Sequence, residues 1–165
     1  MKGDAMNVIV GVDSSTFSDA AIRHVSEAAW PKGTSFLVIS AVAPVFIAPG
    51  EALAPQAIAN YVEQQEQFYK RVAEEAAARL RGAGLVARGI MKRGDPRIVL
   101  EETARSEQAD LVVVGTHGRS GIKKLFLGSV ADHVVTHAPC PVLVVKTPAW
   151  RKEATEAERA AAAAT

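Results

Sequence analysis

A glycine-rich segment in the last third of the chain has the residue types best suited to hold a phosphorylated ligand. It runs from position 115 to position 130 and reads GTHGRSGIKKLFLGSV, between an apolar run and a helical pattern. Glycines there permit positive φ values and let backbone N–H groups approach a ligand closely. Ser129 is the expected N-cap of the following helix. The start of a helix offers amides and a positive dipole end to an anion.

Purely structural explanations compete with this hypothesis. Ser129 and Asp132 match a capping box, which would account for both residues without a ligand. Gly115 would serve equally well as a turn residue between a strand and a loop. The same loop also holds the basic residues Arg119, Lys123 and Lys124. These cations favour phosphate binding, although the two lysines would also keep a loop soluble.

The common phosphate-binding motifs do not occur in this chain. It has neither the P-loop pattern GxxxxGK[ST] nor a GxGxxG pattern. Asp13, which directly follows an apolar run, is a further candidate ligand-binding residue. Its carboxylate can accept a hydrogen bond from a ribose hydroxyl or an adenine amino group, and capping the next helix is an equally good role for it.

The order of these residues resembles the universal stress protein family. The nucleotide-binding fingerprint of that family is a glycine, two residues, a glycine, nine residues, a glycine and then a serine or threonine, and it is matched by Gly115, Gly118, Gly128 and Ser129. Further stretches similar to the family are GVDS at 11–14, ADLVVVG at 109–115 and HAPCPVLVV at 137–145. The resemblance extends from about Asn7 to Lys146.

The resemblance implies a site for ATP or a related adenine nucleotide. Adenine or ribose would contact Asp13 and the backbone around Val12 and Val42. The fingerprint glycine Gly115 belongs to the same site. The ribose and phosphates would lie against Gly118, Arg119, Gly128, Ser129 and Val130. Any Mg²⁺ would arrive with the nucleotide, because the sequence shows no oxygen-rich ligand set for a dedicated metal site.

The resemblance further implies a stress-response sensor or regulator that acts as a homodimer through its last strand, at 142–145. An apolar strand at the edge of a sheet invites pairing with another chain, which favours the same interface on physical grounds. We expect at most slow ATP hydrolysis, since no residue has the features of a catalytic base near the phosphates. A dimeric interaction module that binds no nucleotide remains an alternative.

Adenylyl transfer is a less favoured alternative. Related enzymes have a Ser-Gly-Gly-x-Asp-Ser loop or a His-x-Gly-His signature, whereas this chain reads VDSS at 12–15 and has no second histidine after His117 and Gly118. His117 would either donate to phosphate or be solvated. His24, His133 and His137 fall on expected helices, and we interpret them as solvated. The spacing of the last two would suit zinc, but no third ligand is apparent.

Alternating strands and helices must position these residues. Runs rich in β-branched residues predict buried strands at 7–12, 35–42, 111–114 and 142–145, with a more polar edge strand at 86–93. An apolar stripe at helical spacing runs from Ile58 to Leu80 and ends at Gly82. Asp95 as N-cap and Pro96 in the first turn would open another helix.

This alternation predicts a doubly wound, Rossmann-like α/β fold. The expected sheet has five parallel strands in the order 3-2-1-4-5, with helices on both faces. Ligands bind such sheets at the carboxyl ends of the strands where the order reverses. Those ends carry GVDSS at 11–15 and GTHG at 115–118, so we expect the two candidate loops to meet at one crevice.

Length and composition set further limits. The chain has 165 residues, of which 48% are hydrophobic, and this suits one nucleotide-binding domain over 1–148 followed by a charged, alanine-rich tail over 149–165. The apolar, proline-bearing stretch 43–51 would either cover the crevice as a lid or pack on the surface.

Charge and targeting signals bear on partners and location. Lysine plus arginine (19) nearly balances aspartate plus glutamate (18), which argues against nucleic acid as the main partner. Cys140 is the single cysteine and is expected to be a structural thiol. No stretch has the features of a signal peptide or a membrane span, so we expect a cytoplasmic protein.

Overall fold

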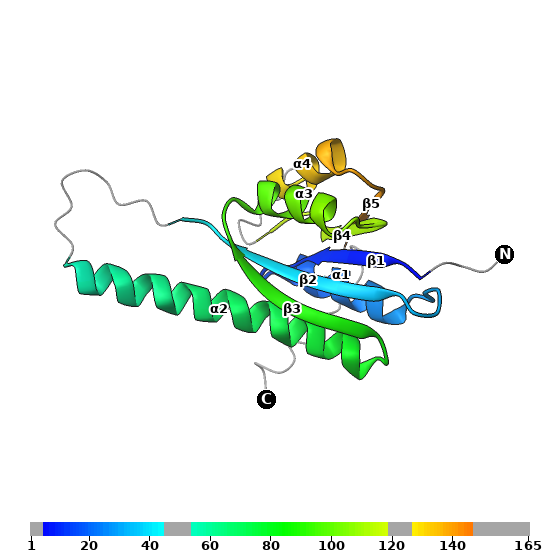
Figure 1. Cartoon of the computed structure of the whole chain (residues 1–165), viewed down its shortest axis with the longest axis horizontal. Coiled ribbons are helices and arrows are strands. Elements are labelled where there is room, and N and C mark those ends of the chain that lie inside the picture. Colours follow the sequence, from blue (N-terminus) through cyan, green and yellow to red (C-terminus); the bar gives the residue numbers. More distant parts are fainter. Residues whose placement is uncertain (1–4, 45–53, 119–126, 147–165) are drawn as a thin grey trace, which may run out of the picture.

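The computed structural model describes residues 5–44, 54–118 and 127–146. Arg119, Lys123, Lys124, most of the expected lid and the tail lie outside these residues. The strands are β1 Asn7–Gly11, β2 Ser35–Val42, β3 Val86–Arg93, β4 Leu111–Gly115 and β5 Val142–Val145 (Figure 1). The helices are α1 Thr16–Glu27, α2 Pro55–Gly82, α3 Pro96–Ser106 and α4 Ser129–His137. The predicted ranges of β2, β3 and β5 are confirmed, while β1 and β4 each differ by one residue.

The described strands form one parallel sheet in the order β3-β2-β1-β4-β5, which confirms the predicted order. In the central strand β1, Val10 lies beside Val38 of β2 and Val113 of β4. The strand order reverses at β1, so a crevice opens between the carboxyl ends of β1 and β4. The more polar β3 lies at one edge and β5 at the other, as predicted.

Side chains alternate between the two faces of the sheet, and each face has its own apolar core. In β1, Val8 and Val10 pack with α1 and α2, whereas Ile9 packs with α3 and α4. Figure 1 shows the two helix pairs on opposite sides of the sheet. The helices that frame the crevice therefore come from both faces.

Helix α2 is longer than the sheet that it covers. Its buried residues are Ala73, Ala76, Ala77 and Leu80, all in its second half, and its first half extends beyond the sheet (Figure 1). A Cβ at Gly89 of β3 would lie 2.5 Å from the Ala73 carbonyl oxygen. Only glycine permits this close packing of α2 on β3, and this contact fixes where the helix crosses the sheet.

The starts of α3 and α4 were both predicted, and one prediction is wrong. Asp95 caps α3, accepting a hydrogen bond from the Arg97 amide at 2.9 Å, with Pro96 in the first turn as expected. The N-cap of α4 is Gly128 rather than Ser129. The Gly128 amide donates to the Thr116 carbonyl at 2.7 Å. This bond ends the incoming loop one residue earlier than the capping-box pattern indicates.

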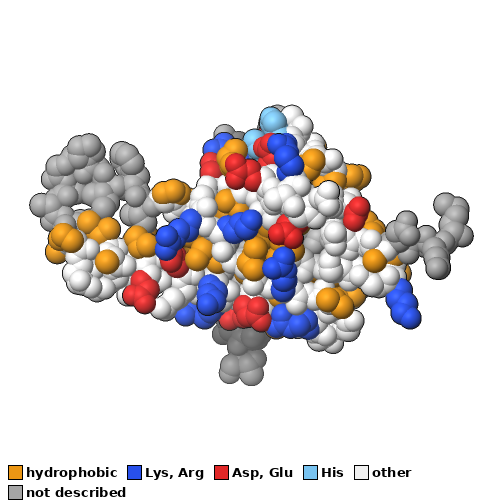
Figure 2. Space-filling model, in the orientation of Figure 1, with side chains coloured by type: hydrophobic (Ala, Val, Ile, Leu, Met, Phe, Trp, Pro, Cys, Tyr) orange, Lys and Arg blue, Asp and Glu red, His pale blue; other side chains and the backbone are white. Residues whose placement is uncertain are grey.

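The surface over β2 and β3 carries charges of both signs. Figure 2 shows Lys and Arg side chains interspersed with Asp and Glu on this face. Several of them form ion pairs, including Arg88 with Glu107 and Arg93 with Glu66. In the part of the chain that the structure describes, no helix combines the length and the apolarity that crossing a membrane requires.

Candidate functional site

A cavity of about 240 Å³ lies at the carboxyl ends of β1 and β4. The predicted site residues that line it are Val12, Asp13, Gly115, Gly118, Gly128, Ser129 and Val130. These residues come from the loop after β1, the end of β4 with the loop that follows it, and the start of α4. The structure thus brings together two sequence regions about a hundred positions apart, at the crevice that the strand order predicted.

Two predicted site residues are not part of this lining. Arg119 lies outside the described residues. Val42 is 8% exposed, and its carbonyl accepts a hydrogen bond from the Gly94 amide at 2.9 Å. Because neighbouring residues of a strand face opposite sides of a sheet, the adjacent Ala41 lines the cavity instead.

The fingerprint glycines let backbone segments approach one another closely. A Cβ at Gly118 would lie 2.7 Å from Oδ2 of Asp13. A Cβ at Gly128 would lie 3.1 Å from the Cα of His117. The two candidate loops are therefore in direct contact.

Packing against α1 also requires a glycine at position 115. A Cβ there would lie 2.8 Å from the backbone of Phe17 in the first turn of α1, too close for any other residue. The packing role considered for this glycine is thus present, and Gly115 also lines the cavity.

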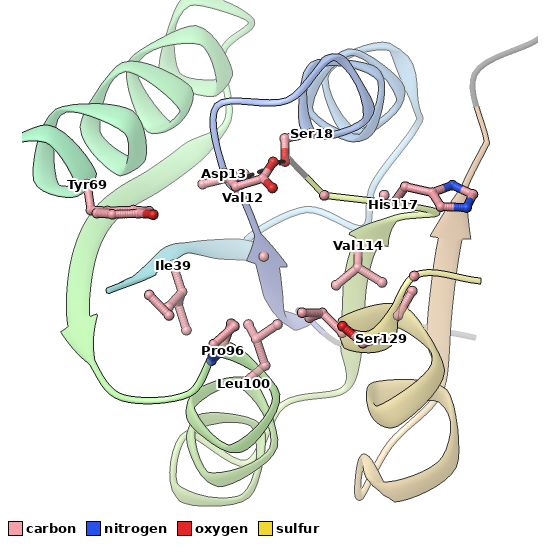
Figure 3. A pocket seen from close by; sticks show the side chains of 17 residues that line it. Val12, Asp13, Ser18, Ile39, Tyr69, Pro96, Leu100, Val114, His117 and Ser129 are labelled. Carbon is pink, nitrogen blue, oxygen red and sulfur yellow. Dashed lines mark hydrogen bonds between the residues drawn. The ribbon is translucent and has the colours of Figure 1, made fainter. Parts of the chain in front are cut away.

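Asp13 is held by a network of hydrogen bonds. Its Oδ1 accepts from the Ser18 hydroxyl at 2.7 Å (Figure 3), and its own amide donates to the same hydroxyl at 2.8 Å. Oδ1 also accepts from the Ser15 amide at 3.0 Å. The N-cap of α1 is Ser15, whose side chain accepts from the Ser18 amide. The helix-capping role considered for Asp13 therefore belongs to Ser15. The network fixes the carboxylate at the cavity wall.

The other end of the cavity is apolar. Ile39 and Ala41 of β2, Pro96 and Leu100 of α3 and Tyr69 of α2 line it. In Figure 3, Tyr69 points from α2 into the space above Ile39, on the side opposite Ser129. Backbone amides and a carboxylate thus surround one part of the cavity, and apolar side chains with one aromatic ring surround the other. Such a lining suits a ligand with an anionic group and an aromatic group.

The histidines differ in their surroundings. His117 lines the cavity, but its ring points away from the centre (Figure 3) and packs against the Phe17 ring, with centroids 5.1 Å apart. The interpretation of His133 as solvated is wrong, because its side chain is only 20% exposed. Its Nε2 lies 2.9 Å from Oε2 of Glu101 in α3, and its ring stacks on that of His137. The hydrogen bond from His133 lowers the pKa of Glu101.

Metal-binding clusters and the thiol of Cys140 are the other candidate ligand groups. Within residues 5–44, 54–118 and 127–146, no three His, Cys, Asp or Glu side chains are arranged to hold a metal ion. Cys140 is half-buried beside the core under α3 and α4, and burial raises the pKa of its thiol. This thiol is therefore a packing group at neutral pH.

Comparison with known proteins identifies the family. The model of the Universal stress protein family matches residues 5–146. The chain belongs to this family. The universal stress protein in the QAH/OAS sulfhydrylase 3′ region of Thermus aquaticus is 34% identical over 139 residues, which are 84% of this chain and 97% of that relative.

Solved universal stress proteins share the fold. UspA from Lactobacillus plantarum matches with a TM-score of 0.70 at 20% identity, over 85% of this chain and 97% of that chain. A universal stress protein in complex with cAMP matches with a TM-score of 0.59 at 28% identity, over 88% of this chain and 100% of that one. Two further neighbours hold AMP (Arabidopsis thaliana, TM-score 0.62, 19% identity) and dAMP (Archaeoglobus fulgidus, TM-score 0.55, 21% identity).

Sequence analysis missed several residues of this universal stress protein's cavity. Ser18 had a signal, because Ser15 and Ser18 are three positions apart, at the spacing of a capping box. Leu100 belongs to an amphipathic helix, so the pattern of apolar residues in the sequence could not distinguish it from a residue of the core. Tyr69 lies one position away from the apolar stripe of α2. This offset was the only indication in the sequence that its side chain is not part of the apolar core.

Proposed function

We propose that this universal stress protein binds ATP in the cavity between β1 and β4 and acts as a cytoplasmic stress-response regulator. The observation that carries the proposal is the convergence of both candidate loops and the start of α4 on one cavity. The neighbours solved with AMP, cAMP and dAMP support an adenine nucleotide as the ligand. The proposed activity is binding and signalling, with hydrolysis at most slow.

The phosphates are proposed to lie at the start of α4. The first amides of a helix have no partner within the helix, and the positive dipole end attracts anions. Gly128, Ser129 and Val130 line the cavity at this point, opposite Gly118 of the β4 loop. Arg119 would add a cation from the same loop, and Mg²⁺ would enter with the nucleotide.

The ribose is proposed to lie beside Asp13. Two donors already hold Oδ1 of Asp13, the Ser15 amide and the Ser18 hydroxyl. The carboxylate is therefore oriented before a ligand arrives, which lowers the entropy lost on binding. A ribose hydroxyl donating to this carboxylate would set the distance between the base and the phosphates.

Regulation is proposed to act through a dimer. The strand β5 lies at the sheet edge and consists of valine and leucine, VLVV, and an apolar edge of this kind can pair with a second copy. Nucleotide binding would then change this surface or the affinity for another protein. Analytical ultracentrifugation tests the dimer, and a single monomeric species at micromolar concentration would rule it out.

The nucleotide site is tested by calorimetric titration of ATP with Mg²⁺ into the wild type and two glycine variants. We expect a dissociation constant of about 1 μM, which corresponds to about −8 kcal/mol. Gly128→Ala places a methyl group 3.1 Å from the His117 Cα, so the loop and the start of α4 must move apart. We expect this variant to bind at least about tenfold more weakly, since the donors lose their alignment.

Gly82→Ala is the matched control. An added Cβ at Gly82 meets no heavy atom within 4 Å, and the residue lies at the end of α2, away from the cavity. We expect it to bind ATP as the wild type does. Absence of heat and of thermal stabilisation by excess ATP in the wild type would contradict the proposal, because a ligand of the native state must stabilise it.

A further inference from the structure

The apolar end of the cavity contains one tyrosine, Tyr69 of α2, which is not part of the family fingerprint. It lines the cavity together with Ile39, Ala41, Pro96 and Leu100. Among these, Tyr69 has the only aromatic ring, and Figure 3 shows its ring and hydroxyl directed into the cavity from the α2 side. The ring therefore faces the place where a ligand's apolar part would lie.

The position of Tyr69 on α2 is well defined. The close packing of Gly89 on Ala73 fixes α2 against β3 one helical turn further along. The ring of Phe68 lies 5.4 Å from that of Tyr69, at an interplanar angle of 84°, an edge-to-face arrangement of favourable energy. Tyr69 is thus half-buried, on a helix whose position is fixed and beside the Phe68 ring, although it does not belong to the buried face of the helix.

The two ends of the cavity also determine which way a nucleotide must lie. Phosphates need hydrogen-bond donors, and backbone amides line the cavity at the start of α4 and at Gly118. A purine base is a flat, weakly polar ring that binds best against apolar and aromatic surfaces. The apolar end at Ile39, Pro96 and Tyr69 is therefore the part of the lining suited to the base.

We propose that Tyr69 is a base-recognising residue, whose ring forms the α2 wall of the subsite that holds the adenine. The inference rests on the proposed nucleotide function and adds to it a residue outside the glycine fingerprint. The ring supplies contact area at low entropic cost, because a tyrosine side chain has few rotatable bonds. The hydroxyl contributes less than the ring.

The test compares ATP with tripolyphosphate, which has the phosphates but no base, by calorimetry on the wild type and on three tyrosine variants. Loss of an aromatic wall weakens the binding of a base by about tenfold or more. We therefore expect Tyr69→Ala to bind ATP at least about tenfold more weakly and to bind tripolyphosphate as the wild type does. Tyr69→Phe keeps the ring and should bind ATP within about threefold of the wild type.

Tyr61→Ala is the matched control, because Tyr61 is the same residue type on the same helix, is 51% exposed and does not line the cavity. We expect it to bind both ligands normally. Unchanged ATP affinity in Tyr69→Ala, or equal loss of ATP and tripolyphosphate, would overturn the assignment to the base. A Tyr69→Phe variant as weak as Tyr69→Ala would overturn the role of the ring. If the wild type bound no ATP, the proposed function would fail, and this inference with it.

Discussion

Helices α3 and α4 start at the same cavity and on the same face of the sheet, yet their starts are built differently. Helix α3 is capped by the carboxylate of Asp95, which also pairs with Arg97. Helix α4 is capped by Gly128, which has no side chain to occupy the first amides. Both starts line the cavity, through Pro96 in α3 and Ser129 in α4.

The difference separates a structural helix start from one that can receive a ligand. In α3 the cap supplies its own anion, and hydrogen bonds from Arg97 lower the pKa of Asp95 to about 2. A second anion would meet a carboxylate there. In α4 a carboxylate, Asp132, also lies in the first turn, but no side chain caps the helix, so its first amides remain open to a ligand. This difference supports the proposed place of the phosphates at α4, where α3 supplies only an apolar wall.

Replacing the glycine cap of α4 with aspartate, the residue type that caps α3, should have the largest effect on ATP affinity. Gly128→Asp places a carboxylate where phosphate is proposed to lie, and like charges in contact cost several kcal/mol. We expect ATP to bind on the order of 100-fold more weakly. Calorimetric titration measures the change.

Gly128→Asn is the matched control for this substitution. It has the same shape and can also cap a helix, but it has no charge, so the difference between the two variants isolates the electrostatic part. Equal affinities of the Asp and Asn variants would show that the α4 start does not face phosphate.

Removing the cap of α3 should affect folding rather than binding. Asp95→Ala leaves the first amides of α3 without their acceptor and should lower the free energy of unfolding by about 1 kcal/mol. ATP affinity should stay within about twofold of the wild type, since α3 contributes only apolar contacts. Chemical unfolding followed by circular dichroism measures the first effect, and calorimetry the second. A large loss of ATP affinity with unchanged stability would reverse the roles assigned to the two helix starts.

The contribution of Asp95 should also depend on pH. Its pKa falls from 3.8 to about 2 on folding, so the ionised form is the one that the fold stabilises. Its contribution is present above the unfolded pKa and is lost as the pH falls toward the folded value. The stability difference between wild type and Asp95→Ala should therefore shrink below about pH 4. A difference that persists undiminished into acid would mean that the ionised carboxylate is not what caps the helix.

The sequence predicted the fold well because its signals are local. Strand patterns, the Asp95 and Pro96 helix start and the polar edge strand each depend on a few adjacent residues. The predicted N-cap of α4 was wrong by one position, because the hydrogen bond from Gly128 to Thr116 joins the two ends of the loop between β4 and α4, which are far apart in the sequence. A capping box read from Ser129 and Asp132 contains no information about that bond.

Only some residues of the cavity could be predicted, namely those whose positions follow from local signals and the strand order. The loops carrying Asp13 and Gly118 follow adjacent strands, so the strand order was enough to bring them together. Tyr69 depends on where α2 crosses the sheet, which the contact of Gly89 with Ala73 determines. His133 appeared solvated because its partner, Glu101, is 32 positions away on another helix.

The smallest expected effect concerns the bond that joins the two helices. His133 of α4 hydrogen-bonds to Glu101 of α3, and this bond lowers the pKa of Glu101. The ionised carboxylate therefore stabilises the fold above its unfolded pKa, and this contribution is lost as the pH falls through the folded value. Glu101→Gln keeps a hydrogen-bond acceptor and loses only the charge, so its melting temperature should fall less than that of Asp95→Ala.

Thermal melts at about pH 6 and about pH 3 check this, and the difference between wild type and Glu101→Gln should be smaller at the second pH than at the first. Glu102→Gln is the matched control, because Glu102 is an exposed neighbour on the same helix. It should melt as the wild type does at both pH values. If the two glutamine variants melted alike, the charge of Glu101, which faces His133 of α4 and Arg105 of α3, would contribute nothing to stability.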